Sequence, residues 1–219
     1  MHKVATRVFE KSAPDFVNEL AVIANFLISN PDLAPKPSSG DEFGSENFWE
    51  SLAAKFIRGR TPRAPLEPST IPDTMVSIIV QEYFGVESDS IAKAAKQHSI
   101  SMAAENIVGD LLERYLASNL EAYGWVWCSG EVVKKVDFLA AKKGQTSQWV
   151  PLQIKNRDNS ENSSSSSVRK GTEIIKWFRT FSRTGRTNWD AFPELIDNVS
   201  LSEKAFEEFV RHYLRELKS

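Results

Sequence analysis

The stretch from Gly109 to Arg157 reads GDLLERYLASNLEAYGWVWCSGEVVKKVDFLAAKKGQTSQWVPLQIKNR, and its pattern decides the fold that we predict. Up to about Leu120, apolar residues recur at spacings of three and four, which predicts an amphipathic helix. After Gly124 the chain becomes rich in β-branched and aromatic residues, which predicts strands. The predicted strands are WVWCS (125–129), EVVKKVDFLAA (131–141) and SQWVPLQIK (147–155). KKGQTS, between the last two, suits a hairpin turn.

The predicted helix starts before this stretch, with Ser101 as its N-cap. Its apolar stripe consists of Ala104, Ile107, Val108, Leu111, Leu112, Tyr115, Leu116 and Leu120. Glu105, Gly109 and Glu113 lie four apart along one edge of that stripe. Glycine inside a helix costs about 1 kcal/mol relative to alanine. We therefore expect a neighbouring element to approach the helix closely at Gly109.

Polar residues on the predicted strands share one side of the sheet. In the last strand Val150, Leu152 and Ile154 point one way, whereas Gln153 and Lys155 point the other. The two polar residues are roughly 6.6–6.8 Å apart along the strand, two steps of the strand repeat. Asp137 ends the preceding apolar run. These positions, with Glu113 on the helix, are the candidate catalytic residues.

The four residues suit metal-dependent phosphodiester hydrolysis, because Mg²⁺ prefers oxygen ligands and activates water beside a phosphate. We assign Asp137 as central ligand, with the side-chain carbonyl of Gln153 and the backbone carbonyl of Ile154. Glu113 would add a carboxylate through water, and Lys155 would orient the attacking water or stabilise developing charge. The alternative is an exposed strand face with solvated Gln153 and Lys155. For Glu113 it is a surface helix acid that pairs with a neighbour, and such a pair usually contributes little to stability.

The order of these elements resembles the PD-(D/E)xK nuclease superfamily. The matching motifs are G-x-x-x-E at 109–113, V-D-F at 136–138 and Q-I-K at 153–155, within residues 105–157. The resemblance implies an α/β (α+β) fold with a central mixed β-sheet flanked by helices. Val136 stands where the superfamily has proline, and Gln153 stands where it has an acid. The second departure removes one negative charge from the metal site.

The following residues, NRDNSENSSSSSVRKG (156–171) and TEIIKWFRTFSRTGRTNW (172–189), are similar to the corresponding segment of the SinI-type restriction endonucleases. That resemblance implies a homodimer that cleaves double-stranded DNA with Mg²⁺ at a short palindromic site. It further implies GG(A/T)CC as the recognised sequence. Other nucleases with this core, acting in repair or in mobile elements, are the alternative function. A DNA-binding protein without catalysis is the third, because Gln153 replaces an acid.

Side chains that read bases are concentrated after the last strand. Arginine can hydrogen-bond guanine through two bonds, and asparagine can do the same to adenine. The candidates for reading DNA are Asn156, Arg157, Asp158, Asn159 and Asn162, followed by Ser163 and Ser164 as phosphate donors. Further along, the candidates are Arg169, Lys170, Arg179, Arg183 and Arg186. The serine run alone would indicate a flexible linker. Trp177 and Trp189 are more typical of packing than of base stacking.

The remaining segments predict further helices. These are residues 14–29, with Ser12 and Asp15 as a capping box, 45–58, 73–83 with Asp73 as N-cap, 90–97, and a C-terminal helix with Ser200 and Glu203 as its capping box. We predict a helical N-terminal subdomain over 1–100, packed on a nuclease core over 101–219. Arg58, Arg60 and Arg63 form a basic cluster that is either a solvated loop or a contact to phosphate.

Bulk properties exclude several classes of protein. Hydrophobic residues are 41% and charged residues 26% of 219, as in soluble domains with a sizeable core. A net charge of −2 argues against a purely electrostatic DNA binder. Cys128 is the single cysteine, so we expect no disulfide and a cytoplasmic location. Without a long apolar run or a GxxxxGK loop, we expect neither membrane binding nor a nucleotide cofactor.

Overall fold

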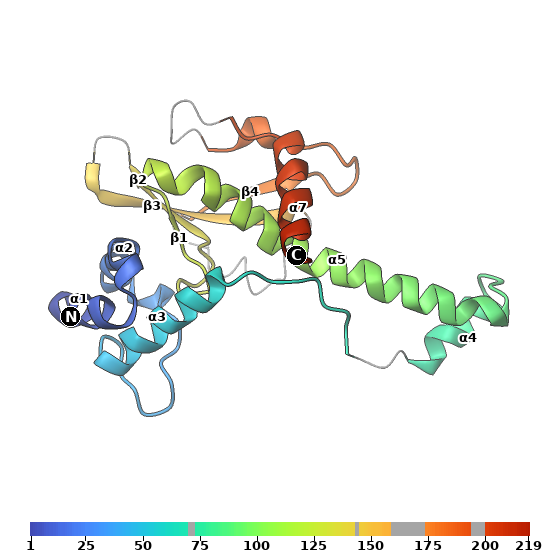
Figure 1. Ribbon diagram of the computed structural model, residues 1–219, viewed down its shortest axis with the longest axis horizontal. Coiled ribbons are helices and arrows are strands. Elements are labelled where there is room, and N and C mark those ends of the chain that lie inside the picture. Colours follow the sequence, from blue (N-terminus) through green and yellow to red (C-terminus); the bar gives the residue numbers. More distant parts are fainter. Residues whose placement is uncertain (70–72, 143–144, 159–173, 194–199) are drawn as a thin grey trace.

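The structure is a computed structural model that describes residues 1–69, 73–142, 145–158, 174–193 and 200–219, without the side chains of 141–148. A four-stranded sheet lies at its centre, in the order β1 (Val126–Trp127), β2 (Phe138–Lys142), β3 (Gln145–Arg157) and β4 (Ile175–Thr180). β1–β2 and β2–β3 are antiparallel, and β3–β4 is parallel (Figure 1). The predicted mixed sheet flanked by helices is confirmed.

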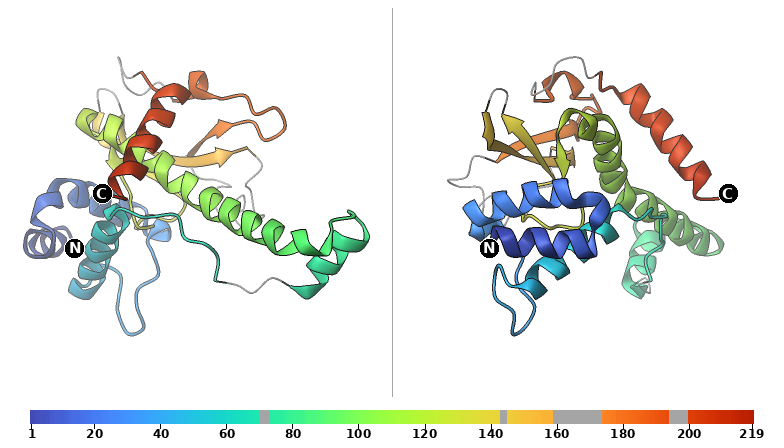
Figure 2. Two further views of the ribbon diagram at one scale, coloured as in Figure 1. Left: turned by 45° about the vertical axis from the view of Figure 1, so that its right-hand side comes forward. Right: turned by 60° about the vertical axis from the view of Figure 1, so that its left-hand side comes forward.

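Helices cover both faces of the sheet (Figure 2). On one face, α1 (His2–Ser12), α2 (Val17–Ser29) and α3 (Glu46–Arg60) pack against Val126 and Leu139. On the other, α5 (Ser88–Leu120) and α7 (Glu203–Glu216) pack against Trp127 and Phe138. Neighbouring strand residues thus enter opposite cores, as the two-residue repeat of a strand requires. Short 3-10 helices span Pro14–Phe16, Pro31–Leu33, Glu121–Tyr123 and Trp189–Ala191.

Helix α5 is longer than predicted, because residues 88–120 form one continuous helix of 33 residues. Ser101 lies inside it, so its assignment as an N-cap is wrong. No proline interrupts the segment, and a serine inside a helix can remain helical. The expected close approach at Gly109 is also wrong. A Cβ added there would have no heavy atom within 4 Å among the described residues.

The helix starts were predicted with mixed success. Ser45 caps α3 by accepting a hydrogen bond from the Phe48 N–H, and Asp73 caps α4 (Thr74–Glu82) as expected. The predicted capping box at Ser12 is wrong. Ser12 is the last residue of α1, and its hydroxyl donates to the Val8 carbonyl of that helix. Ser202, rather than Ser200, caps α7. Ser12 belongs to the preceding helix and cannot cap the next one, whereas Ser202 directly precedes α7 and can.

The segment before β2 is a series of turns rather than the predicted strand. Glu131 and Lys135 have positive φ angles of 56° and 62°, which interrupts extended pairing over 131–137. Regular pairing begins only at Phe138, opposite Leu152. The consequence is that Asp137 lies immediately before β2, next to the first residue of an internal strand of the sheet.

Two glycines allow α3 to touch the turn that follows β1. A Cβ at Gly59 would lie 2.3 Å from the backbone nitrogen of Gly130, and one at Gly130 would lie 2.1 Å from the carbonyl oxygen of Lys55. Gly130 also has a φ of +76°. Both positions therefore require glycine, for space and, at Gly130, for conformation.

We expect Gly130→Ala to lower the free energy of unfolding by about 2–4 kcal/mol, which combines overpacking with left-handed strain. In thermal denaturation this corresponds to a fall in Tm of roughly 4–16 °C for a chain of this size. Gly85→Ala is the matched control, because Gly85 has a φ of +68° with open space around it. Equal losses in both variants would show that the contact with Lys55 contributes nothing.

No helix within the described ranges is long and apolar enough to span a bilayer.

Candidate active site

Asp137 is fixed on three sides by backbone groups. Its N–H donates to the Leu152 carbonyl at 2.8 Å, and its own carbonyl accepts from the Cys128 N–H at 2.8 Å. Its carboxylate Oδ2 accepts from the Ile154 N–H at 2.6 Å. The side chain therefore lies directly against β3, where Gln153 and Lys155 flank Ile154. This rigidity places the carboxylate before any ligand arrives.

Glu113 reaches the same place from α5. Its Oε2 accepts a hydrogen bond from the indole Nε1–H of Trp127 at 2.9 Å, so β1 orients it. Burial and then the negative charge of Asp137 raise the pKa of Glu113 above its usual range. The Trp127 hydrogen bond and the charge of Lys155 act in the opposite direction. Trp127, which holds Glu113, is followed by Cys128, whose N–H donates to the Asp137 carbonyl, so the same short segment contacts both acidic residues.

The positive charge of Lys155 lowers the pKa of both carboxylates. Burial raises the pKa of Asp137, while the Ile154 N–H and then Lys155 lower it. The structure thus brings together Glu113, Asp137 and Lys155, with Gln153 on the same strand. Gln153 is 3% exposed, so the alternative of a solvated strand face is wrong for this residue. Leu152 and Ile154 enter the core on the other face, as predicted.

The donor atoms fit a hard divalent cation. Two carboxylates lie partly buried beside each other, and each is disfavoured as an anion in this environment. A bound cation would remove that cost, because an adjacent positive charge favours the ionised form. Among the described residues no three His, Cys, Asp or Glu side chains form a metal-binding group. Mg²⁺ is commonly bound by one or two carboxylates, with waters and substrate phosphate as its other ligands.

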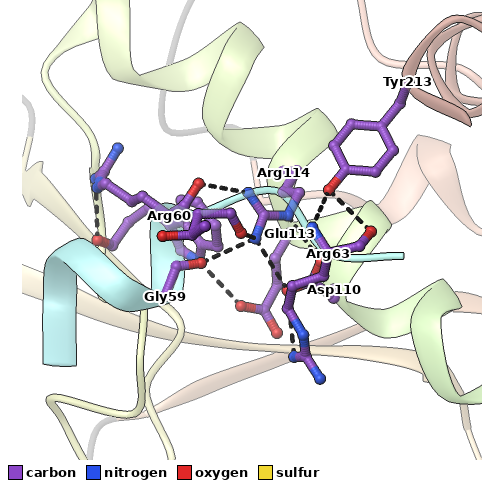
Figure 3. Close-up of polar contacts among 9 residues, drawn as sticks. Gly59, Arg60, Arg63, Asp110, Glu113, Arg114 and Tyr213 are labelled. Carbon is purple, nitrogen blue, oxygen red and sulfur yellow. Dashed lines mark hydrogen bonds and ion pairs between the residues drawn. The ribbon is translucent and has the colours of Figure 1, made fainter. Parts of the chain in front are cut away.

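An arginine next to Glu113, which we did not predict, anchors this turn of α5 (Figure 3). Arg114 donates to the carbonyls of Gly59, Arg60 and Thr61 at 2.7–2.9 Å and pairs with Asp110 at 2.7 Å. The end of α3 leaves those carbonyls without partners inside the helix. Arg114 donates hydrogen bonds to these carbonyls, and this contact with the end of α3 fixes the position of the α5 turn that carries Glu113. The Asp110–Arg114 spacing of four was the only signal in the sequence.

The basic cluster before α4 has divided roles. The Arg60 guanidinium pairs with Glu121 at 2.6 Å and lies over the rings of Phe56 and Trp127, so for Arg60 neither a solvated loop nor a phosphate contact is right. The backbone N–H of Arg63 donates to the Tyr213 hydroxyl at 2.7 Å, and its side chain is 66% exposed. Arg58 is exposed.

The segment around β4 places its polar residues in two groups. Arg179 donates to the Asn156 side-chain carbonyl at 2.9 Å and forms an ion pair with Glu203. Asp158 accepts from the N–H and hydroxyl of Ser182. These contacts join the end of β3 to β4 and to α7. Asn156, Asp158 and Arg179 are thus engaged inside the chain.

Three candidate arginines are exposed, namely Arg157, Arg183 and Arg186. Asn159, Asn162, Ser163, Ser164, Arg169 and Lys170 lie outside the described residues. Trp177 and Trp189 are buried with ring centroids 5.1 Å apart, which confirms their packing role. Because β3 and β4 are parallel and Arg157 is opposite Thr180, the two strands finish at the same end of the sheet.

Comparisons with known proteins find similar proteins over nearly the whole length of the chain. The family model described as SinI restriction endonuclease matches residues 2–216. The type II restriction enzyme Eco47I of Escherichia coli is 43% identical over 215 residues, which cover 97% of this chain and 93% of that enzyme. The type II restriction enzyme SinI of Salmonella infantis is 42% identical over 219 residues, which cover 99% and 95%.

Proposed function

The chain belongs to the SinI restriction endonuclease family and is a type II restriction endonuclease. We propose that it cleaves duplex DNA with Mg²⁺ and that its active site consists of Glu113, Asp137, Gln153 and Lys155. One observation carries the assignment. Glu113, held by the indole N–H of Trp127, and Asp137, held by the N–H of Ile154, lie partly buried beside the strand that carries Lys155. Buried carboxylates whose pKa values are raised in this way are typical of functional sites.

The cation would be held by oxygen atoms from three elements. These are the carboxylates of Asp137 and Glu113, the side-chain carbonyl of Gln153 and the backbone carbonyl of Ile154. When bound, Mg²⁺ would lower the pKa of a coordinated water and neutralise negative charge on the phosphate. Gln153 contributes no charge, so Glu113 and Asp137 together would supply both negative charges of the site.

The chain's own groups provide the positioning. The backbone N–H of Ile154 holds Oδ2 of Asp137, and the indole Nε1–H of Trp127 holds Oε2 of Glu113, so both carboxylates are already positioned before DNA binds. The Lys155 Nζ is a donor that would orient the attacking water and favour the negative charge developing on the phosphate. Preorganised donors of this kind usually make the largest single contribution to transition-state stabilisation in an enzyme.

We further propose that the enzyme is a homodimer that reads a short palindrome, with GG(A/T)CC as the target implied by the SinI-type resemblance. Two-fold symmetry of the protein would match that of the DNA. Arg157 lies two residues after Lys155 on β3, so base reading and cleavage would share one strand. Arg183 and Arg186, exposed after β4 at the same end of the sheet, would contact phosphates.

We expect Arg157→Ala to weaken discrimination at one base pair by about 1–3 kcal/mol, because arginine forms two hydrogen bonds with guanine. Competition binding with duplexes that carry single base changes would measure it in Ca²⁺. Arg183→Ala is the comparison, since loss of a phosphate contact lowers affinity for all duplexes alike. An unchanged site preference in Arg157→Ala would refute the base contact.

The function is tested by incubating the full chain with a long duplex DNA and Mg²⁺. We expect discrete fragments whose ends map to one palindromic sequence, and no cleavage in EDTA. A smear of fragments, or a preference for branched DNA, would contradict site-specific cleavage and support the repair-type alternative. Binding without cleavage in Mg²⁺, Mn²⁺ or Co²⁺ would contradict the proposed chemistry.

A further inference from the structure

An arm formed by residues 73–102 projects from the body of the protein (Figures 1 and 2). It consists of α4 and the first half of α5, and α4 packs against α5. None of the nine residues of α4, all of which the structure describes, is buried. An isolated pair of short helices of this kind contributes little core of its own, so the arm needs a partner surface to be covered.

The apolar face of α4 points away from its own chain. Met75, Ile79 and Tyr83 follow one another at spacings of four, with Val76 beside them, and these four side chains are 55–81% exposed. Ser77, Val80 and Gln81 are half-buried and lie on the other side of the helix, where Gln81 donates to the Ser88 hydroxyl of α5. The more polar side of α4 therefore packs internally.

The exposed apolar area of the arm is large. The exposed fractions are Met75 55%, Val76 56%, Ile78 44%, Ile79 55%, Tyr83 81%, Phe84 68%, Ile100 52% and Met102 38%. At roughly 150 Å² for a fully exposed large side chain, the stripe of Met75, Val76, Ile79 and Tyr83 exposes about 370 Å², and the other four residues bring the total for the arm to about 700 Å². The largest apolar patch of an ordinary monomer is about 300–600 Å², whereas each partner of a standard interface buries about 800 Å².

The charge of the arm argues against DNA and anionic lipids as the partner. Residues 73–102 contain four carboxylates and two lysines, which gives a net charge of −2 with His98 neutral. DNA phosphates and anionic lipids would be repelled by such a surface rather than attracted. The stripe itself carries no charge, so it is compatible with an identical stripe. Contacts between identical apolar patches are the ordinary means of forming two-fold dimers.

We propose that the exposed apolar surface of the arm, centred on the stripe of Met75, Val76, Ile79 and Tyr83, is the homodimer contact, covered by the same surface of a second copy of this chain. This inference rests on the proposed two-fold cleavage of a palindrome. Because α5 continues without a break from Ser88 to Glu113, over about 38 Å, one rigid element links the contact to the cleavage site. Pairing of the arms would set the spacing between the two sites.

The test compares wild type with Ile79→Glu/Tyr83→Glu and with Leu66→Glu as the control. Leu66 is 77% exposed and lies outside the arm, so the control adds charge to an exposed apolar residue elsewhere. Sedimentation at several concentrations should give wild type and control at twice 24.6 kDa. The arm variant should dissociate about 100-fold more readily or sediment at the monomer mass, with an unchanged circular dichroism spectrum.

Cysteine cross-linking gives an independent positive test. Cys128, the single cysteine, is buried, so an added cysteine is the reactive one. Under mild oxidation Ile79→Cys should form a disulfide dimer, and Leu66→Cys should not. Equal cross-linking in both would overturn the proposed contact.

The failures are distinguishable. Discrete cleavage by an arm variant that remains dimeric would overturn the arm contact and leave the proposed cleavage intact. An arm variant that keeps its mass but loses specific DNA binding would overturn the proposal in favour of a DNA contact. Wild type that sediments as a monomer, free and on DNA, while cutting at a palindrome would overturn both the arm contact and the homodimer. Absence of cleavage by wild type would overturn the proposed chemistry.

Discussion

Asp137→Asn is expected to lower the single-turnover rate of DNA cleavage by about 10³-fold or more. The proposed cation would lose its central negatively charged ligand, a change of several kcal/mol in transition-state stabilisation, and each 1.36 kcal/mol is tenfold in rate. Asparagine is nearly isosteric with aspartate, and its side-chain carbonyl can still accept the Ile154 hydrogen bond. The fold and specific DNA binding should therefore survive.

The measurement combines cleavage in Mg²⁺ with binding to the same duplex in Ca²⁺ and thermal denaturation without metal. Folding raises the pKa of Asp137, so its ionised form opposes folding, and this cost increases as the pH rises through that pKa. At neutral pH the variant should be at least as stable as wild type. Asp32→Asn, at an exposed position far along the chain, should change nothing. Cleavage by Asp137→Asn at the wild-type rate would refute the central ligand.

Lys155→Met is expected to lower the cleavage rate by about 10²–10³-fold, comparable to removing one preorganised donor in other enzymes. Methionine keeps much of the length of lysine and removes its charge and its donors. The positive charge of Lys155 lowers the pKa of both Glu113 and Asp137, so its loss also makes both carboxylates harder to ionise. The effect should be smaller at higher pH, where the carboxylates ionise without help.

Rates at several pH values, with Lys204→Met as control, would measure this effect. Lys204 is exposed on α7, outside the site. Specific binding in Ca²⁺ should remain within a few-fold of wild type, because base contacts, rather than Lys155, would give the specificity. A variant that binds poorly but cleaves every bound molecule at the wild-type rate would show that Lys155 serves DNA binding instead.

The arrangement of Asp137, Gln153 and Lys155 followed from local patterns. The two-residue repeat of a strand puts Gln153 and Lys155 on one side, and a hairpin brings the preceding strand beside them. The prediction of a long amphipathic helix with Glu113 was sound for a similar reason, since its apolar stripe has a period near 3.6. Local periodicity is sufficient where one face of an element is buried.

Tertiary contacts were beyond such patterns. Nothing in the sequence indicates that the Trp127 indole holds Glu113 or that Gln153 is buried. The arginines divide in the same way. Arg60, Arg114 and Arg179 are engaged in internal pairs, whereas Arg183 is exposed, although all four look alike in the sequence. The sequence shows where the arginines are, but tertiary packing decides which guanidinium groups are exposed and which are held inside the protein.

The single-turnover rate of a one-site duplex, measured against Mg²⁺ concentration for wild type and Glu113→Gln, tests the shared metal site most directly. Glutamine keeps the size of glutamate and can accept the Trp127 hydrogen bond, so the variant removes mainly a charge. We predict no cleavage without divalent cation, and for Glu113→Gln a requirement for about 10–100-fold more Mg²⁺. Cleavage by wild type in EDTA, or the same Mg²⁺ dependence in both proteins, would contradict the site built from Glu113 and Asp137.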